Sequence, residues 1–383
     1  MAETTDFEAE GLLDGLEGEA REARQDLLKN LANDGVGLDE LRLAVEEDRL
    51  ALLPLERALA SEYRYTPEEV AEKAGIQLEL LLLNLRSLGL PVPQPGERLL
   101  TEEDLEAALR AKTFTDAGLP AEGIMEVTRV IGMSMAQLAE ATRSLIGEVY
   151  LQAGDTERDL GLRYVEMAKL MTPVLGDTMQ YVYARHLRES IKQAAVSEAD
   201  RASGELVGST DVTVAFADLV GFTRLGERLE VSEIGEISGR LAEIATSIVE
   251  SPVRLIKMIG DAAMIVAPEP GPVVETALRL VEAVETDEQL PPLRAGAARG
   301  EALARAGDWY GRPVNLASRI TNFAIGDSVV VNEAVKDALE EDEGPYRFSY
   351  AGKRRFKGIQ GEVAVYRVRR REPGGRSASV PGA

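Results

Sequence analysis

The chain has 383 residues, enough for two or three domains, and its hydrophobic fraction of 45% is ordinary for a globular protein. The absence of cysteine excludes disulfides, a thiol nucleophile and a thiolate metal site, so any metal must bind to carboxylates, which favours Mg²⁺ or Mn²⁺. The net charge of −23 argues against general nucleic-acid binding, because that affinity comes from basic groups on phosphates.

The first fifty residues are acidic, and their apolar residues recur with the spacing of an amphipathic helix. The N-terminal stretch MAETTDFEAE lacks the apolar segment of a secretory signal. No apolar run approaches the ~20 residues that a helix needs to cross a bilayer. We therefore expect a cytoplasmic protein without a membrane span.

Two capping boxes mark helix starts in the next part of the chain. Thr66 with Glu69 forms the first, on a helix that stops at Gly75, and Thr101 with Asp104 forms the second. Two short helices and a turn here resemble the helix-turn-helix of winged DNA-binding domains. The segment that would read DNA, QLELLLLNLRSLG, is apolar with a single arginine, so a small helical packing unit is the favoured interpretation. A DNA-binding transcriptional regulator with a nucleotide-sensing C-terminal domain is the alternative function.

Further helices are predicted up to about residue 200, and the last of them, at about 172–200, links the two halves of the chain. The methionines of this helical domain are most simply core residues, with a lipid or other apolar ligand as the alternative. The only histidine, His186, lies in the linking helix between Arg185 and Arg188. Because histidine titrates near neutral pH, a regulatory role for His186 as a pH sensor is one hypothesis. A surface or packed histidine without such a role is the other.

From Ser209 onward, short β-branched segments alternate with amphipathic helices, which indicates a second domain of mixed structure. We therefore divide the chain into an all-helical domain at 1–200, a second domain at 201–371 and a disordered tail at 372–383.

Two aspartates in the second domain lie where packing alone would not place them. Asp218 is set in the apolar strand VAFADLVGFT, and a carboxylate buried without a cation would be costly. Asp261 belongs to the Gly-Asp pair of VRLIKMIGDAAMIV, whose two β-type runs predict a hairpin with Asp261 at its tip. Lys257 precedes that tip by about one hairpin arm. A Gly-Asp hairpin tip is common in proteins, whereas an aspartate inside an apolar strand is much less so.

Polar residues also gather in two later stretches. RAGDWYGRPVNLASRI places Asp308 before a predicted helix, on which Asn315 and Arg319 are four residues apart and share a face. GKRRFKG supplies a basic cluster that includes Lys357. An asparagine–arginine pair at this spacing is usually a solvated helix face. Two carboxylates on neighbouring strands with cationic groups nearby, however, are typical of two-metal phosphoryl transfer.

Over about residues 206–368 the chain resembles the catalytic domain of class III nucleotidyl cyclases. The resemblance is carried by FADLVGFT, KMIGD and GDWYGRPVNLASRI, in the family's order and spacing. It implies an α+β fold, with a ferredoxin-like, palm-type C-terminal domain preceded by an all-α regulatory domain. The implied activity is that of an adenylyl cyclase, a phosphorus–oxygen lyase that converts ATP to 3′,5′-cyclic AMP and pyrophosphate. The GG[DE]EF signature of domains that make cyclic dinucleotides is absent from the sequence.

The resemblance also implies residue roles. Asp218 and Asp261 match the aspartates that bind two divalent ions, Mg²⁺ or Mn²⁺, and a metal ion would then be the partner of the strand carboxylate. Lys257 and Asp308 match the pair that selects the base. A lysine donates to adenine N1 and a carboxylate accepts from the exocyclic amine, whereas guanine presents the reverse pattern, so this pair predicts ATP.

Three further positions match substrate-contacting residues of the family. Asn315 matches the asparagine that orients the ribose, Arg319 the arginine that stabilises the pentavalent transition state, and Lys357 a triphosphate-binding lysine. In this family each site combines residues of two subunits. A chain with the complete set is therefore expected to form a homodimer with two equivalent sites.

The helical first half is similar to the regulatory domain of pH-sensing bacterial cyclases. We expect it to modulate the catalytic domains, by inhibiting them in a pH-dependent way. The linking helix joins the two domains and could transmit a rearrangement between them.

Overall fold

The structure is a computed structural model that describes residues 6–59, 63–150, 153–193, 209–340 and 344–371. The chain divides into two compact units, Met1–Ala195 and Val196–Ala383. The expected domain boundary near residue 201 and the expected tail at 372–383 lie outside the described residues.

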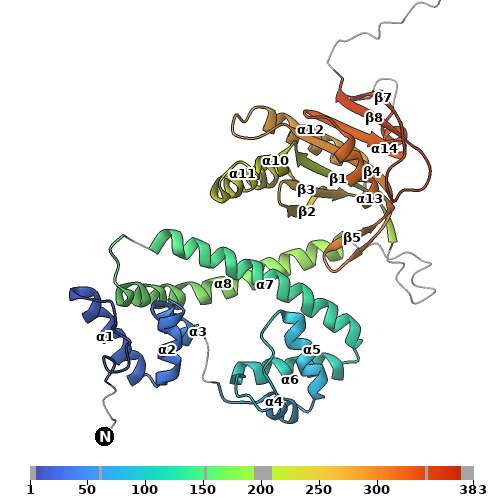
Figure 1. The fold of residues 1–383 in the computed structure, drawn as a ribbon. Coiled ribbons are helices and arrows are strands. Elements are labelled where there is room, and N and C mark those ends of the chain that lie inside the picture. Colours follow the sequence, from blue (N-terminus) through green and yellow to red (C-terminus); the bar gives the residue numbers. More distant parts are fainter. Residues whose placement is uncertain (1–5, 60–62, 151–152, 194–208, 341–343, 372–383) are drawn as a thin grey trace, which may run out of the picture. The chain divides into compact units, whose positions relative to one another are not determined.

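The described part of the first unit is helical (Figure 1). Its elements are α1 (Gly18–Asn33), α2 (Leu38–Glu46), the 3₁₀ turn η1 (Leu50–Leu52), α3 (Leu53–Leu59), α4 (Pro67–Ala74), α5 (Leu78–Leu88), α6 (Glu102–Asp116), α7 (Ala121–Tyr150) and α8 (Glu157–Gln193). None of the helices in the described ranges combines the length and the apolar character that a bilayer crossing requires.

Both predicted capping boxes are present. The Thr66 hydroxyl accepts a hydrogen bond from the Glu69 backbone N–H at 3.3 Å, and the Glu69 carboxylate accepts one from the Thr66 N–H at 3.0 Å. Gly75 ends α4 in the left-handed conformation, with φ of +66°, as predicted. In α5, the would-be DNA-reading helix, Leu81 and Leu85 are buried in the local core, in agreement with a packing unit.

The second unit is built on an eight-stranded sheet. Its elements are β1 (Ser209–Leu219), α10 (Phe222–Leu225), α11 (Val231–Ile248), β2 (Arg254–Ile259), β3 (Ala262–Ala267), α12 (Pro270–Glu285), β4 (Leu293–Arg305), β5 (Asp308–Gly311), α13 (Arg312–Phe323), β6 (Ser328–Asn332), α14 (Glu333–Leu339), β7 (Tyr346–Arg354) and β8 (Val363–Arg370). The strand order is β2-β3-β1-β4-β6-β8-β7, with β5 paired to β4. Within it, β1-α11-β2-β3-α12-β4 has the strand order of the ferredoxin-like fold. The predicted α+β class is therefore confirmed.

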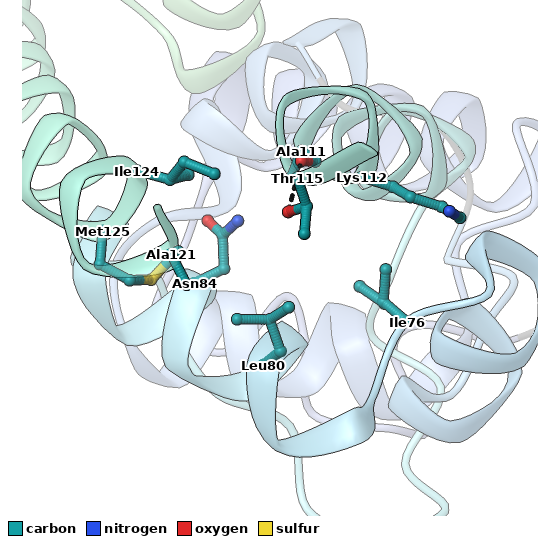
Figure 2. A pocket seen from close by; sticks show the side chains of 9 residues that line it. All are labelled: Ile76, Leu80, Asn84, Ala111, Lys112, Thr115, Ala121, Ile124 and Met125. Carbon is teal, nitrogen blue, oxygen red and sulfur yellow. Dashed lines mark hydrogen bonds between the residues drawn. The ribbon is translucent and has the colours of Figure 1, made fainter. Parts of the chain in front are cut away.

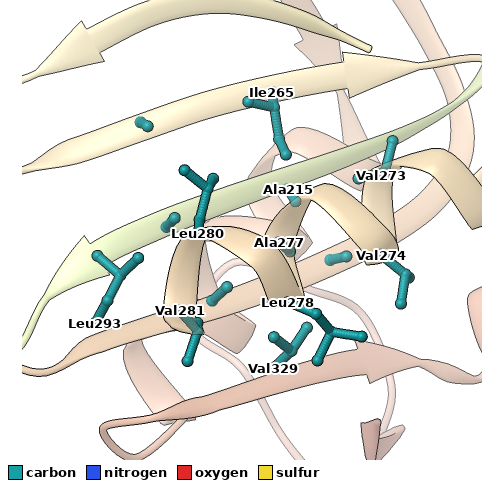
Figure 3. Close-up of a cluster of buried hydrophobic side chains, with 14 of the residues drawn as sticks. Ala215, Ile265, Val273, Val274, Ala277, Leu278, Leu280, Val281, Leu293 and Val329 are labelled. Atoms are coloured by element: carbon teal, nitrogen blue, oxygen red, sulfur yellow. The ribbon is translucent and has the colours of Figure 1, made fainter. Parts of the chain in front are cut away.

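Both faces of the central strand β1 are buried, which explains why its sequence is almost continuously apolar. Side chains alternate between the faces, so Ala215 and Leu219 join the core beneath α11 and α12, whereas Val214 and Phe216 join the core beneath α13. Figure 3 shows α12 packed over the first of these cores. By this alternation Asp218 belongs to the α13 face of the sheet.

The close approach of α13 to the sheet depends on Gly296 in β4. A Cβ added there would lie 2.7 Å from the carbonyl carbon of Ile320 and would collide with the backbone nitrogen of Thr321. The Thr321 hydroxyl donates to the Ala317 carbonyl at 2.8 Å, and it lies 3.2 Å from the Phe216 carbonyl of β1. The sheet and α13 therefore meet backbone to backbone, which fixes the helix that carries Asn315 and Arg319.

Candidate active site

Asp218 lies one residue before the end of β1, with about a fifth of its side chain exposed. Its Oδ2 atom accepts hydrogen bonds from Arg294, at 2.6 Å from Nη2 and 3.0 Å from Nε. Arg294 stands directly opposite Asp218 in the β1–β4 register. The cation that neutralises the strand carboxylate within the chain is therefore an arginine that the sequence analysis missed. The available signal was an arginine at the start of the apolar segment LRAGAA.

Asp261 lies in the two-residue turn between β2 and β3, as predicted. Gly260 occupies the first turn position with φ of +59°, which suits glycine. The Asp261 carbonyl accepts from the Leu219 N–H at 3.1 Å, so the turn lies beside the end of β1. Burial raises the pKa of the Asp261 carboxyl, and the charge of Asp218 adds to this rise, while a backbone hydrogen bond and Arg294 act in the opposite direction.

These two carboxylates fit the divalent cations that the sequence implies. They are hard oxygen donors, and the Asp261 carboxyl, whose pKa is raised first by burial, lies near enough to Asp218 for that charge to raise it further. In the described ranges, no group of three or more His, Cys, Asp or Glu side chains is arranged as a metal site. Asp218 and Asp261 would therefore supply only part of a coordination shell, which suits Mg²⁺ because it keeps several waters and binds substrate phosphates.

The structure also brings Lys257 and Asp308 together. Lys257, half-buried on β2, donates to the Asp308 Oδ2 atom. The other carboxylate oxygen, Oδ1, accepts from the Trp309 N–H at 2.8 Å. Trp309 is buried, and the Arg254 guanidinium of β2 lies 5.8 Å from the centre of its ring. The β4–β5 hairpin is thus anchored to β2, which places the two residues within contact. The sequence predicted Asp308 just before a helix, and the short strand β5 ahead of that helix was not predicted.

Asn315, Arg319 and Lys357 are exposed. Asn315 and Arg319 share a face of α13, as their spacing predicts, and Lys357 lies in the connection between β7 and β8. Within the described residues, no hydrogen bond or ion pair joins these three side chains to Asp218, Asp261, Lys257 or Asp308. A single chain therefore assembles two pairs of candidate site residues and leaves three further candidates facing solvent.

The regulatory candidate His186 is exposed on α8, in the helical unit. The same unit contains a small pocket between α5, α6 and the start of α7 (Figure 2), with a volume of about 20 Å³. Such a volume holds about one water molecule. It gives no support to the apolar ligand considered for this domain. The pocket is lined by Ile76, Leu80, Asn84, Ala111, Lys112, Thr115, Ala121, Ile124 and Met125.

Solved structures that are similar to part of this chain include cyclase domains. The catalytic core of a rhodopsin-guanylyl cyclase with converted specificity, in complex with ATPαS, is 25% identical and matches 42% of this chain and 97% of its own, with a TM-score of 0.39. The adenylyl cyclase CyaB from P. aeruginosa is 19% identical over 42% of this chain and 94% of its own, with a TM-score of 0.36.

Sequence comparison covers nearly the whole chain. Residues 5–191 match the family described as adenylate cyclase regulatory domain, and residues 207–370 match the adenylate and guanylate cyclase catalytic domain. The pH-sensitive adenylate cyclase MT1302 of Mycobacterium tuberculosis is 39% identical over 97% of this chain and 94% of its own length. An adenylate cyclase of Streptomyces coelicolor is 35% identical over 76% of each chain. The chain therefore belongs to the class III adenylate cyclases, in the group that carries an adenylate cyclase regulatory domain ahead of the catalytic domain.

Proposed function

We propose that this enzyme converts ATP to 3′,5′-cyclic AMP and pyrophosphate at sites formed between two copies of the chain. The observation that carries the proposal is the presence, in one catalytic unit, of two adjacent carboxylates and a separate lysine–aspartate pair. The first group suits triphosphate-bound divalent cations, and the second suits a purine edge. Family membership supports the same reaction.

The base would be selected by Lys257 and Asp308. Lysine is only a donor and ionised aspartate only an acceptor, so the pair complements adenine N1 and its exocyclic amine. Guanine would place its N1–H donor opposite the lysine, which is also a donor, and its O6 acceptor opposite the aspartate, which is also an acceptor. Neither hydrogen bond could then form. In the structure the two side chains bind each other, and the base would replace this mutual contact with one hydrogen bond to each.

Asp218 and Asp261 would hold two Mg²⁺ or Mn²⁺ ions, which supply charge neutralisation at the triphosphate and lower the pKa of the ribose 3′-hydroxyl. The side chains of the protein would mainly position the substrate. Asn315 would orient the ribose for in-line attack on the α-phosphorus. The planar guanidinium of Arg319 would stabilise the charge that develops on the phosphoryl oxygens, and Lys357 would bind the triphosphate.

The exposed state of Asn315 and Arg319 supports a site completed by a second copy of the chain. Apolar side chains lie beside the site residues, at Ile259 before the Asp261 turn and at Tyr310 after Asp308, and they are 49% and 53% exposed in the protomer. Burial against a partner would remove this apolar surface from water. A two-fold symmetric pair would contain two equivalent sites.

Regulation by the helical unit is the second part of the proposal. We infer that this unit inhibits the catalytic units in a pH-dependent way through α8, a continuous helix of 37 residues that carries His186 near its C-terminal end. The similarity to a cyclase named as pH-sensitive supports this view. The test compares the full chain with residues 201–383 alone between pH 5 and pH 8. The full chain should be less active, by a factor that depends on pH, and equal activity throughout would end the idea. His186→Ala tests the histidine separately.

The reaction is tested by incubating the purified full chain with ATP or GTP and Mn²⁺ and identifying the product by chromatography. Cyclic AMP and pyrophosphate are expected from ATP, with little product from GTP. Asp218→Ala should lower the rate at least ~100-fold, because it removes a ligand from the metal site. An Asp211→Ala variant is the matched control, because Asp211 lies on the same strand, away from the site, and pairs with Arg299. Unchanged activity of Asp218→Ala would contradict the proposed site.

A further inference from the structure

The guanidinium of Arg294 donates four hydrogen bonds, two to Asp218 and two to Asn322. Its Nε and Nη2 atoms both donate to Asp218 Oδ2. At its other end, Nη1 donates to the Asn322 backbone carbonyl and Nη2 to the Asn322 Oδ1 atom, both at 3.2 Å. The guanidinium therefore bridges the end of β1 and the last turn of α13.

This ion pair differs from an ordinary surface salt bridge. The side chains of Arg294 and Asp218 are only 20% and 21% exposed, so solvent screens their attraction incompletely. Their backbones are fixed opposite each other in the sheet, and the carbonyl of Asn322 in the last turn of α13 holds the guanidinium from the far side. Little conformational entropy is lost when such a prearranged pair forms.

The position of the arginine has a consequence for cation binding. Both of its hydrogen bonds to Asp218 end on one carboxylate oxygen, Oδ2, and its positive charge already compensates the carboxylate. A divalent cation would be attracted by the same negative charge, and only the other carboxylate oxygen, Oδ1, is left without a hydrogen bond from Arg294. Arginine and metal therefore compete for Asp218.

We propose that Arg294 is a positioning residue that occupies the Asp218 carboxylate in the nucleotide-free enzyme and weakens its affinity for divalent cations. This inference rests on the proposed function, because it takes Asp218 to be a metal ligand. It makes the free enzyme a poor binder of Mg²⁺ or Mn²⁺, so that the cation enters together with the triphosphate rather than ahead of it. Asn322 keeps the guanidinium near the site when its contact with Asp218 is broken.

The test measures binding of Mn²⁺ alone to the full chain, without nucleotide, from the electron paramagnetic resonance signal of free Mn²⁺. Arg294→Ala and Arg294→Gln should each bind Mn²⁺ about tenfold more tightly than the wild type, since an adjacent opposite charge changes carboxylate equilibria by about that factor or more. Arg294→Lys keeps the charge and should gain less. Arg299→Ala, which removes an arginine–aspartate pair from the middle of the same strand, should leave the affinity unchanged.

Two further measurements separate the outcomes. Circular dichroism and thermal unfolding identify variants that remain folded, and the Gln and Lys substitutions keep the test valid where Ala does not fold. Adding Asp218→Asn to Arg294→Ala should abolish the gain in affinity. If Mn²⁺ binding depends on Asp218 but neither Arg294→Ala nor Arg294→Gln tightens it, the inference is wrong and the proposed function stands. If Asp218→Asn leaves Mn²⁺ binding unchanged in both backgrounds, the proposed metal role of Asp218 fails, and this inference fails with it.

Discussion

At the scale of single residues, the candidate site concentrates opposing charges in a small volume. Asp218 and Asp261 repel each other, and Arg294 compensates Asp218 directly while acting on Asp261 through space. The positive charge of Arg294 therefore acts on both carboxylates. Without a metal ion at neutral pH, repulsion between Asp218 and Asp261 therefore remains unfavourable for the folded enzyme. A divalent cation bound between the two carboxylates would remove this repulsion.

Asp261→Asn should stabilise the metal-free enzyme at pH 7 while it abolishes metal-dependent activity. Because the folded protein raises the pKa of Asp261, the neutral form favours folding. That contribution is present below the carboxyl pKa of the unfolded chain and is lost as pH rises through the higher pKa of the folded state. Asparagine keeps the shape without the charge, so the melting temperature should rise on the order of a few °C, and the difference should vanish as pH falls.

Differential scanning calorimetry in EDTA, between pH 4 and pH 8, measures this difference. Glu243→Gln, which neutralises an exposed acid on α11, is the control and should not alter the melting temperature. Mn²⁺ added together with 3′-deoxy-ATP, which lacks the attacking hydroxyl, should reverse the order of the two proteins, because it stabilises only the one that binds it. An Asp261→Asn variant that melts below the wild type at pH 7 in EDTA would contradict the electrostatic account.

At the scale of elements, α13 is the part that positions most of the site. Its inner face packs on β4 at Gly296, its outer face presents Asn315 and Arg319, and its last turn holds Arg294 through Asn322. A displacement of this helix would therefore move catalytic candidates and the arginine at Asp218 together. The position of α13 on the sheet should therefore affect both the stability of the protein and its activity.

Gly296→Ala should destabilise the protein by at least ~2 kcal/mol, because the added methyl group meets the backbone of α13 and the helix must shift. Gly239→Ala is the matched control. It lies within α11 with no atom within 4 Å of the added Cβ, so it should be neutral or stabilise by ~0.5–1 kcal/mol. Urea unfolding of both variants measures the difference. Equal stability of the two would mean that α13 has more freedom than its contacts indicate.

Local features of these elements could be predicted from the sequence. The capping box at Thr66, the turn at Asp261 and the shared face of Asn315 and Arg319 each depend on residues a few positions apart. The Arg294–Asp218 pair could not be predicted in the same way, because the two residues are 76 positions apart and meet only through the register between β1 and β4. Strand register is decided by the packing of both sheet faces, which no local pattern encodes.

At the scale of the whole molecule, the net charge of −23 sets the conditions for binding an anionic nucleotide. The long-range field would repel ATP, so attraction must come from local cationic groups and divalent ions. Arg319 and Lys357 are such groups, and both face solvent without an ion pair in the described residues of the chain. Their uncompensated charge is consistent with a triphosphate bound across two chains.

Mixing two inactive variants tests this arrangement. If metal ligands come from one chain and the arginine from the other, Asp218→Ala and Arg319→Ala each disable both sites of a homodimer. Their heterodimer, however, combines an intact metal side with an intact arginine at one of its two sites. Since about half of randomly exchanged dimers are heterodimers, activity should return to about a quarter of the wild-type value. Cyclic AMP production after co-expression of differently tagged chains measures the recovery.

Asp218→Ala mixed with Asp261→Ala is the control pair. Both substitutions lie on the metal side, so every site of that heterodimer keeps one defective metal side and no activity should return. The two mixtures differ only in which side of the proposed site carries the second defect. Recovery in the first and not in the second therefore requires Asp218 and Arg319 of a working site to belong to different chains. Heterodimers recovered through both tags but inactive in the first mixture would place the two residues in one chain, and the proposed arrangement of the site would then be wrong.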